Sequence, residues 1–310
     1  MKPIEFTVPK EEIARVKGLG FLQDKLTADC FNGRVITRNG KITAQEAKII
    51  AEAAEKFGSG EIAMTSRLAI EIQRVPFDHI APLCDFLAQH GLETGGTGPK
   101  VRPIVSCKGT TCQYGLIDTF SLSEKIHERF YKGYHSVKLP HKFKIAVGGC
   151  PNNCVKPDLN DLGVVGQRVP KADLEKCRGC KVCQIEKNCP IKNAKLEDGK
   201  INMHPESCNH CGRCVGKCPF TAVEAEVTGY KVCIGGRWGK RVAMGQPLEK
   251  IFTSEEEVLS IIEKAILLFR EQGEAGERFA DTINRLGFEN VQAQLLSDEI
   301  LNRKEAILAE

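Results

Sequence analysis

Twelve of the fifteen cysteines in this 310-residue chain lie in three groups, and that clustering constrains the fold more than any other feature. One tight run reads CRGCKVCQIEKNCP, a second reads CNHCGRCVGKCP, and two looser pairs read CKGTTC and CPNNC. In that order the groups are Cys177, Cys180, Cys183 and Cys189; Cys208, Cys211, Cys214 and Cys218; and Cys107, Cys112, Cys150 and Cys154. Thiols at this density either form disulfides or bind metal.

The redox compartment decides between these two uses. No apolar stretch approaches the ~20 residues of a membrane span, and the first residues lack the apolar core of a signal peptide. We therefore expect a cytoplasmic location without membrane attachment, where disulfides are rare and clustered cysteines bind metal. A net charge of +4 and an aromatic content of 6% give no reason to expect a nucleic-acid partner.

The two tight runs have the spacing that binds cubane iron–sulfur clusters. A Cys-x-x-Cys-x-x-Cys loop supplies three thiolates from one turn, and in two-cluster ferredoxins the fourth comes from the other run. We therefore assign one [4Fe-4S] cluster to Cys177, Cys180, Cys183 and Cys218, and a second to Cys208, Cys211, Cys214 and Cys189. The first run has five residues rather than three before its last cysteine, which lengthens one loop. A zinc-binding module is the alternative, but it does not account for two triplets that each end in Cys-Pro.

Outside the cysteine runs, the sequence predicts an α+β protein with the ferredoxin segment inserted into it. Thr43 and Glu46 are spaced as a capping box before a helix that Gly58 ends, and Ser254 and Glu257 repeat this spacing before a long amphipathic helix. The composition of the cysteine-rich segment changes to lysine, cysteine and proline. We expect a half-domain over residues 1–95, a second domain over 96–168 and 227–310, and an inserted two-cluster ferredoxin domain over 169–226.

The two looser cysteine pairs predict a different kind of site. Free cysteines can pack as small apolar residues, but the glycines in GGCPNNC allow the backbone to approach a large cofactor closely. In these pairs the chain resembles the sirohaem-containing sulfite and nitrite reductases, although its first pair encloses four residues where the family usually has five. The resemblance implies a third [4Fe-4S] cluster held by Cys107, Cys112, Cys150 and Cys154, and a sirohaem. It also implies that Cys154 bridges this cluster to the sirohaem iron, with Gly149 and Asn153 next to the cofactor.

The resemblance also assigns basic residues to an anionic pocket. Sirohaem carries carboxylates and the substrate is an anion, so the pocket needs cations although the net charge is small. Arg67 and Arg237 match positions that bind sirohaem carboxylates, and Arg102 matches an arginine that faces the substrate. Lys142 and Lys144 match a lysine pair that binds the anion and delivers protons, and alternate residues of a strand share one face.

One position departs from the family pattern. Cys30 stands where the family commonly has an arginine that contacts the substrate. Arg34 and Arg38 are the candidates to replace this arginine. The sequence motifs therefore do not separate sulfite from nitrite as the substrate.

The resemblance extends over nearly the whole chain and points to small anaerobic or dissimilatory-type sulfite reductase subunits. It implies six-electron reduction of sulfite to sulfide, with electrons entering through the inserted clusters. Nitrite reduction to ammonia and a non-catalytic electron-transfer subunit are the alternatives. No Gly-x-Gly-x-x-Gly element follows a strand, so we expect an external ferredoxin or a reductase partner as electron donor. Because longer family members contain this unit twice, we also expect a homodimer or a dimer with a related subunit.

Overall fold

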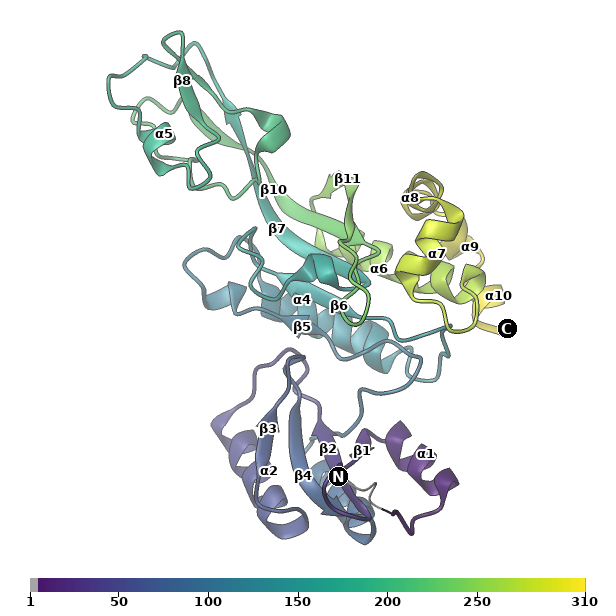
Figure 1. The fold of residues 1–310 in the computed structure, drawn as a ribbon. Coiled ribbons are helices and arrows are strands. Elements are labelled where there is room, and N and C mark those ends of the chain that lie inside the picture. Colours follow the sequence, from purple (N-terminus) through teal and green to yellow (C-terminus); the bar gives the residue numbers. More distant parts are fainter. Residues whose placement is uncertain (1–4, 310) are drawn as a thin grey trace. The chain divides into compact units, whose positions relative to one another are not determined.

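The computed structural model describes residues 5–309, and this part of the chain divides into two compact units. Each unit is assembled from separate stretches of sequence. Figure 1 labels the helices and strands and colours them along the chain. The described residues of the first unit are 5–106, 123–146 and 263–309, and the second unit comprises 107–122 and 147–262. No helix within residues 5–309 is both long and apolar enough to cross a membrane.

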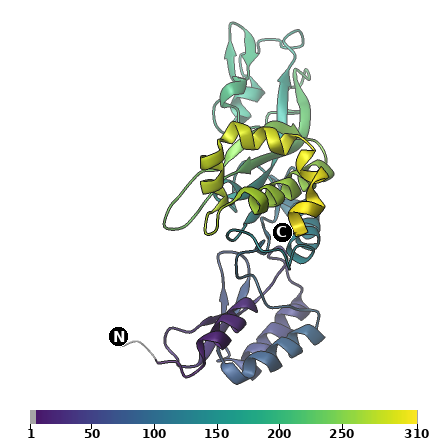
Figure 2. The ribbon, with the colours of Figure 1, turned by 90° about the vertical axis from the view of Figure 1, so that its right-hand side faces the viewer.

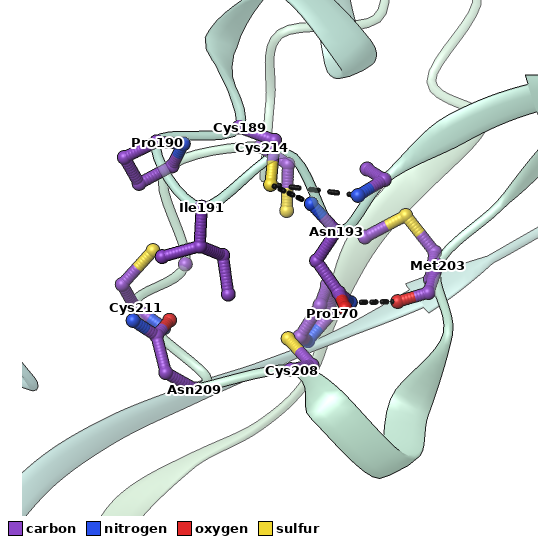
Figure 3. A pocket seen from close by; sticks show the side chains of 12 residues that line it. Pro170, Cys189, Pro190, Ile191, Asn193, Met203, Cys208, Asn209, Cys211 and Cys214 are labelled. Atoms are coloured by element: carbon purple, nitrogen blue, oxygen red, sulfur yellow. Dashed lines mark hydrogen bonds between the residues drawn. The ribbon is translucent and has the colours of Figure 1, made fainter.

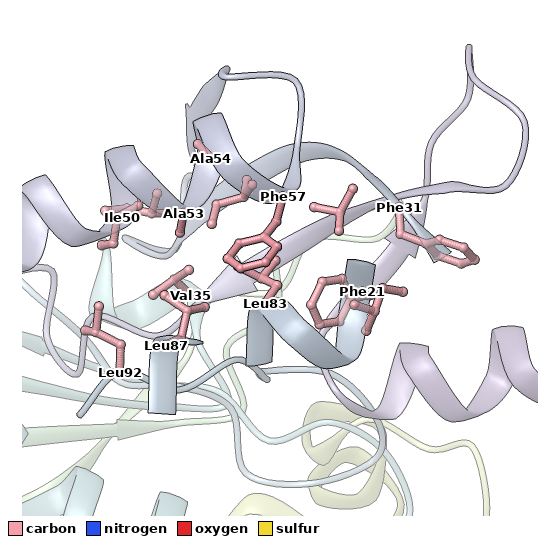
Figure 4. Close-up of a cluster of buried hydrophobic side chains, with 14 of the residues drawn as sticks. Phe21, Phe31, Val35, Ile50, Ala53, Ala54, Phe57, Leu83, Leu87 and Leu92 are labelled. Carbon is pink, nitrogen blue, oxygen red and sulfur yellow. The ribbon is translucent and has the colours of Figure 1, made fainter. Parts of the chain in front are cut away.

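The first stretch of the first unit forms an antiparallel sheet with the strand order β1-β2-β4-β3. Its strands are β1 (Phe21–Gln23), β2 (Cys30–Val35), β3 (Ile62–Met64) and β4 (Ile70–Pro76). The short β5 (Val105–Ser106) follows later in the chain and pairs with β6 (Ile145–Gly148) in a different sheet. The helices of the first stretch are α1 (Lys10–Gly18), α2 (Ala44–Phe57) and α3 (Ile80–Gln89), the last preceded by a 3₁₀ turn, η1 (Phe77–His79). Side chains of α2, α3 and the strands share one hydrophobic core, in which Phe31, Ala53 and Leu83 are fully buried (Figure 4).

Local sequence explains where α2 begins and ends. The Thr43 hydroxyl accepts a hydrogen bond from the Glu46 N–H at 3.1 Å, and the Glu46 carboxylate accepts one from the Thr43 N–H at 2.6 Å. This confirms the predicted capping box, which satisfies two N–H groups that the first helical turn leaves without partners. Gly58 follows the last helical residue, as predicted.

The remainder of the first unit is mostly helical. Its later helices lie side by side (Figure 2). They are part of α6 (Glu255–Gln272) and all of α7 (Phe279–Leu286), α8 (Phe288–Leu296), α9 (Glu299–Asn302) and α10 (Lys304–Ala309). The rings of Phe143, Phe269 and Phe279 pack together with centroids 5.2–5.9 Å apart. Helix α4 (Thr119–Ile126) crosses the boundary between the units and continues into η3 (His127–Lys132), a π-helical stretch.

Long paired strands dominate the second unit. β11 (Gln246–Phe252), β10 (Val223–Ile234), β7 (Leu162–Ala172) and the end of β6 (Ile145–Gly148) follow one another across a sheet. β7 and β10 are antiparallel and paired from Leu162↔Ile234 to Ala172↔Val223. The cysteine-rich segment lies between these paired ends and contains α5 (Gln184–Asn188), the hairpin of β8 (Lys195–Glu197) and β9 (Lys200–Asn202), and η5 (Pro205–Ser207). Because Ala172 and Val223 are neighbours, the two ends of this segment meet, as the ends of an inserted segment must.

Candidate functional site

The cysteine-rich segment surrounds two cavities, and each is lined by three cysteines of one run and one of the other. We name the first the proximal site: it is lined by Cys189, Cys208, Cys211 and Cys214, and its space of about 300 Å³ is partly open to solvent (Figure 3). We name the second the distal site: it is lined by Cys177, Cys180, Cys183 and Cys218, and its space of about 410 Å³ is partly open to solvent. The structure thus gathers the same two groups of four thiols that the sequence pattern assigns to two clusters.

Burial sets the ionisation of the proximal thiols. Burial raises the pKa of Cys214 to about 11, and the neighbouring Cys208, Cys211 and Cys189 thiols also act in this direction. A thiol with such a pKa is neutral at physiological pH unless a bound cation stabilises its thiolate. The Cys189 sulfur accepts backbone hydrogen bonds from Asn193 at 3.2 Å and Ala194 at 3.5 Å, an arrangement suited to a charged thiolate (Figure 3). The donor set therefore fits an iron–sulfur cluster.

The two looser cysteine pairs also meet in space, and we name Cys107, Cys112, Cys150 and Cys154 the loop quartet. Burial raises the pKa of Cys150, and the other three thiols of the quartet also contribute to this electrostatically. Cys154 is exposed, whereas the others are half-buried. The Cys107 sulfur accepts a hydrogen bond from the Gly149 N–H at 3.1 Å.

Close backbone packing holds the two loops of the quartet together. A Cβ atom at Gly149 would lie 2.7 Å from the Gly109 Cα and 3.3 Å from the Thr119 Cγ2, both closer than van der Waals contact. The buried Thr119 hydroxyl donates to the Cys107 carbonyl at 2.7 Å. Gly149 is thus required for the loops to approach each other, and the loop of the first pair is fixed by Thr119.

The turn after Cys150 presents the exposed Cys154. Asn153 has a left-handed backbone with φ of 58°, and its side-chain amide donates to the Asp158 carboxylate at 2.8 Å. The Asp158 carbonyl in turn accepts a hydrogen bond from the Gly245 N–H at 2.7 Å. Gly245 lies at the end of the loop that contains Arg237. Cys154 and the Arg237 loop are therefore anchored to the same turn.

The other basic candidates lie in the first unit. The Arg102 N–H donates to the Phe143 carbonyl at 2.8 Å, and Val101 pairs with Phe143 in a parallel bridge. Val101 and Phe143 are buried in the core. Because side chains alternate along extended backbone, we expect Arg102, Lys142 and Lys144 to project from the face opposite to this core. The Arg102 guanidinium donates a hydrogen bond to the Gly96 carbonyl.

Arg67, another basic candidate, lies close to this face. Its guanidinium donates to the carbonyl of Pro103, the residue after Arg102, at 2.9 Å. The two arginines considered as replacements at Cys30 form ion pairs instead: Arg34 with Glu71 and Arg38 with Glu46, each at 2.7 Å. Cys30 itself is half-buried, and burial raises the pKa of its thiol.

The proximal site and the loop quartet lie next to each other in the second unit, which the sequence pattern did not reveal. Arg168 of β7 forms a bridge with Cys211, and its N–H donates to the His210 carbonyl at 2.8 Å. Two residues earlier on β7, a Cβ atom at Gly166 would lie 2.5 Å from the Gly149 carbonyl oxygen. The Arg213 guanidinium lies 5.4 Å from the centroid of the Tyr114 ring, which belongs to the quartet's first loop.

The thiols of these sites are not placed to bind a single metal ion together. Within residues 5–309, no group of three or more His, Cys, Asp or Glu side chains is arranged to hold one metal ion. A cubane differs, because each thiolate binds a different iron at the outside of the cage. Cubane ligands are accordingly farther apart than the ligands of one ion.

Family models match most of the chain. The model described as nitrite and sulphite reductase 4Fe-4S domain matches residues 97–304, and the nitrite/sulfite reductase ferredoxin-like half domain matches residues 26–90. Coenzyme F420-dependent sulfite reductase of Methanocaldococcus jannaschii is 32% identical over 251 residues, which cover 79% of this chain and 38% of that protein. The alpha subunit of dissimilatory-type sulfite reductase from Allochromatium vinosum is 27% identical over 262 residues, covering 78% and 63%. The chain thus spans less than two thirds of either relative.

A solved structure shares the fold. The crystal structure of dissimilatory sulfite reductase I aligns with a TM-score of 0.68 at 22% identity, covering 86% of this chain and 69% of that one. The expected α+β fold, with a reductase half-domain and a 4Fe-4S domain, is therefore confirmed. The inserted ferredoxin domain, the domain boundaries and the roles of the individual site residues stay predictions.

Proposed function

Because the chain belongs to the nitrite and sulphite reductase family, we propose that it catalyses the six-electron reduction of sulfite to sulfide. The observation that supports this proposal best is the loop quartet lying beside the proximal site within one unit. The names of the relatives favour sulfite as the substrate. A cytoplasmic, reducing location is part of the proposal, because thiols held for iron–sulfur clusters must remain reduced.

Membership of this family implies iron–sulfur and sirohaem cofactors. We assign a [4Fe-4S] cluster to each of the distal site, the proximal site and the loop quartet, since each gathers four thiols. The sirohaem would lie on the exposed side of Cys154, with Arg237 close to its carboxylates and with Gly149 and Asn153 shaping the loop beside it. Bound there, the cofactors would supply electrons and an iron atom at which the substrate is reduced.

The packing of the second unit supports an order for the electron-transfer sites. The distal site is lined by Ala222 and by cysteines that lie beyond the paired ends of β7 and β10. The proximal site contacts β7 at Arg168, and the loop quartet contacts the same strand at Gly166. We therefore propose that electrons enter at the distal site and reach the quartet through the proximal site.

The basic face opposite the core in the first unit supports anion binding. Arg102, Lys142 and Lys144 share this face, and concentrated positive charge stabilises an oxyanion as oxygen atoms leave. Lysine ammonium groups can also donate the protons with which each oxygen leaves as water. We assign to Arg102 the positioning of the anion and to the two lysines its neutralisation and protonation.

Alanine substitution of both Lys142 and Lys144 tests the catalytic assignment. We expect kcat/KM for sulfite to fall at least about 100-fold, because proton donation and charge stabilisation are both lost. Iron content should stay unchanged, since no cluster cysteine is altered. The matched control changes Lys10 and Lys48, exposed lysines of α1 and α2, to alanine and should retain activity.

Undiminished turnover by the Lys142→Ala/Lys144→Ala variant would contradict the catalytic assignment of these two lysines, whereas a wild-type protein that transfers electrons but turns over neither anion would favour a non-catalytic electron-transfer subunit. Cys30 stands where the family commonly has an arginine that contacts the substrate, so the sequence does not identify the anion. Parallel assays on sulfite and nitrite decide between the two.

A further inference from the structure

The distal site has a thin apolar cover toward solvent. Val182 and Phe220 line this cavity together with the four thiols, yet 64% of Val182 and 43% of Phe220 remain exposed. The same two side chains therefore touch both the inside of the site and the solvent. Large exposed apolar side chains grouped in this way mark surfaces that contact other molecules.

Positive charge lies beside this cover, in the loops that form it. The loops 177–183 and 214–220, which contain the four distal thiols, include Arg178, Lys181 and Lys217 but no Asp or Glu. All three side chains are exposed. The Arg178 guanidinium lies 5.5 Å from the centroid of the Phe220 ring, so charge and apolar surface are adjacent.

We propose that this surface, formed by Arg178, Lys181, Val182, Lys217 and Phe220 and named the distal face, docks a small acidic protein that carries a one-electron redox group. The inference rests on the proposed function, because it requires an iron–sulfur cluster at the distal site. Each encounter moves one electron from the reduced donor, which becomes oxidised, to that cluster, and no bond forms or breaks. Weak redox complexes bury little area, which suits a surface of two apolar side chains with three cationic residues in the same loops.

Charge complementarity selects this occupant over a second copy of the chain. Two copies facing each other through the distal face would bring six like charges together, which opposes association. An acidic donor instead is attracted from a distance, and the attraction raises its association rate. Part of the rim of the proximal site is instead covered within the chain, because Cys211 pairs with β7 and Arg213 packs on Tyr114.

The test compares two charge-reversed variants of the cofactor-loaded, full-length protein. One variant carries Lys181→Glu and Lys217→Glu, which change the distal face without altering a residue that lines the cavity. The control carries Lys187→Glu and Lys192→Glu, two exposed lysines of the same segment that line neither cavity. Both variants change the net charge equally. The probe is an acidic two-cluster ferredoxin, and association is followed by stopped-flow at low and high salt.

We expect the association rate of the Lys181→Glu/Lys217→Glu variant to fall at least about tenfold at low salt and to approach the wild-type rate at high salt. The control variant should stay within about twofold of wild type. Equal slowing of both variants, no slowing of either, or no binding of the ferredoxin by the wild-type protein would overturn the proposal. Sulfite reduction driven by a small dye, methyl viologen, does not depend on the distal face. Its absence in the wild-type protein would therefore count against the proposed function rather than against the docking surface.

Discussion

A side chain at position 149 would meet backbone atoms, which cannot move aside as the end of a flexible side chain can. The Gly149 Cα lies against the Gly109 backbone, and the two belong to the two separate loops of the quartet. The approach of four thiols from distant parts of the sequence therefore depends on the absence of one methyl group.

Gly149→Ala should consequently separate the loops. We expect a loss of about four irons per chain, those of the quartet's cluster, and a destabilisation of about 1–3 kcal/mol from overpacking. Iron analysis and urea unfolding measure the two effects. The control is Gly18→Ala, because a Cβ atom at Gly18 would meet nothing within 4 Å. Full iron content in Gly149→Ala would show that the loops can adjust.

Glu263 is a buried carboxylate that three side chains stabilise. Burial alone would raise its pKa, but hydrogen bonds from Lys304 at 2.5 Å, Tyr134 at 2.6 Å and Arg129 at 2.5 Å outweigh burial and lower the pKa. A carboxylate with a lowered folded-state pKa stabilises the fold above its unfolded-state pKa, near 4.5, and loses this effect as the pH falls through the folded-state value.

Glu263→Gln should therefore cost about 2 kcal/mol of unfolding free energy at pH 7. The difference from wild type should shrink as the pH falls below about 4.5, where the native carboxylate also takes up a proton. Urea unfolding at several pH values measures this, and the exposed Glu52→Gln on α2 is the control. A difference that does not vary with pH would mean that packing, not charge, is responsible.

At the scale of single elements, signals confined to a few neighbouring residues predicted the structure well. The capping box of Thr43 and Glu46 is confirmed, and Ser254 and Glu257 exchange the equivalent hydrogen bonds before α6. The pairing of β7 with β10 was not predicted, because it joins residues far apart in sequence and includes a bulge near Val227. Such register depends on tertiary packing rather than local pattern.

The same distinction holds for the candidate site. The spacing of the two cysteine runs was enough to predict which four thiols lie around each cavity, whereas their roles as ligands stay a prediction. The contacts of Arg168 with Cys211 and of Arg213 with Tyr114 have no local signature, because each joins a cysteine run to a different element. The order of the sites along β7 was therefore visible only in the folded chain.

Because Ala172 pairs with Val223, the whole cysteine-rich segment between them can be deleted while β7 and β10 stay paired. Replacing residues 173–222 by Asn-Gly should leave a two-residue hairpin between β7 and β10. We expect iron to fall from about 13 per chain (three clusters of four, plus one sirohaem iron) to about five, with the quartet's cluster retained. Iron analysis and reduction by an acidic ferredoxin, which should be lost, provide the measurements. Loss of all iron would show that the quartet cannot form without the segment.

At the scale of the whole molecule, the basic candidates and the loop quartet belong to different units, and this bears on whether the protein forms a dimer. The basic candidates Arg67, Arg102, Lys142 and Lys144 belong to the first unit, and the loop quartet belongs to the second. We propose a dimer, with a second copy or a related subunit, in which Lys142 and Lys144 of one subunit reach the sirohaem held by the other. Relatives named as subunits are consistent with such an assembly.

Dilution tests this assembly. If two copies form the active site, specific activity should fall as the chain is diluted below the dissociation constant of the dimer, while iron content per chain stays constant. Sedimentation over the same concentrations identifies the dimer. Mixing Lys142→Ala/Lys144→Ala protein with Cys154→Ser protein should then restore part of the activity. Full activity in a diluted monomer would contradict the shared site.

The two residues of β7 from Gly166 to Arg168 fix a distance through the covalent backbone. They place the backbone contacts of the quartet and of the proximal site about 7 Å apart along one strand, a spacing set by the geometry of extended backbone. Bending or lengthening the chain beyond Ala172 leaves this interval unchanged. If electrons follow the route proposed above, the outer part of the segment can be remodelled for new donor proteins over evolution, while the step from the proximal site to the quartet keeps its distance.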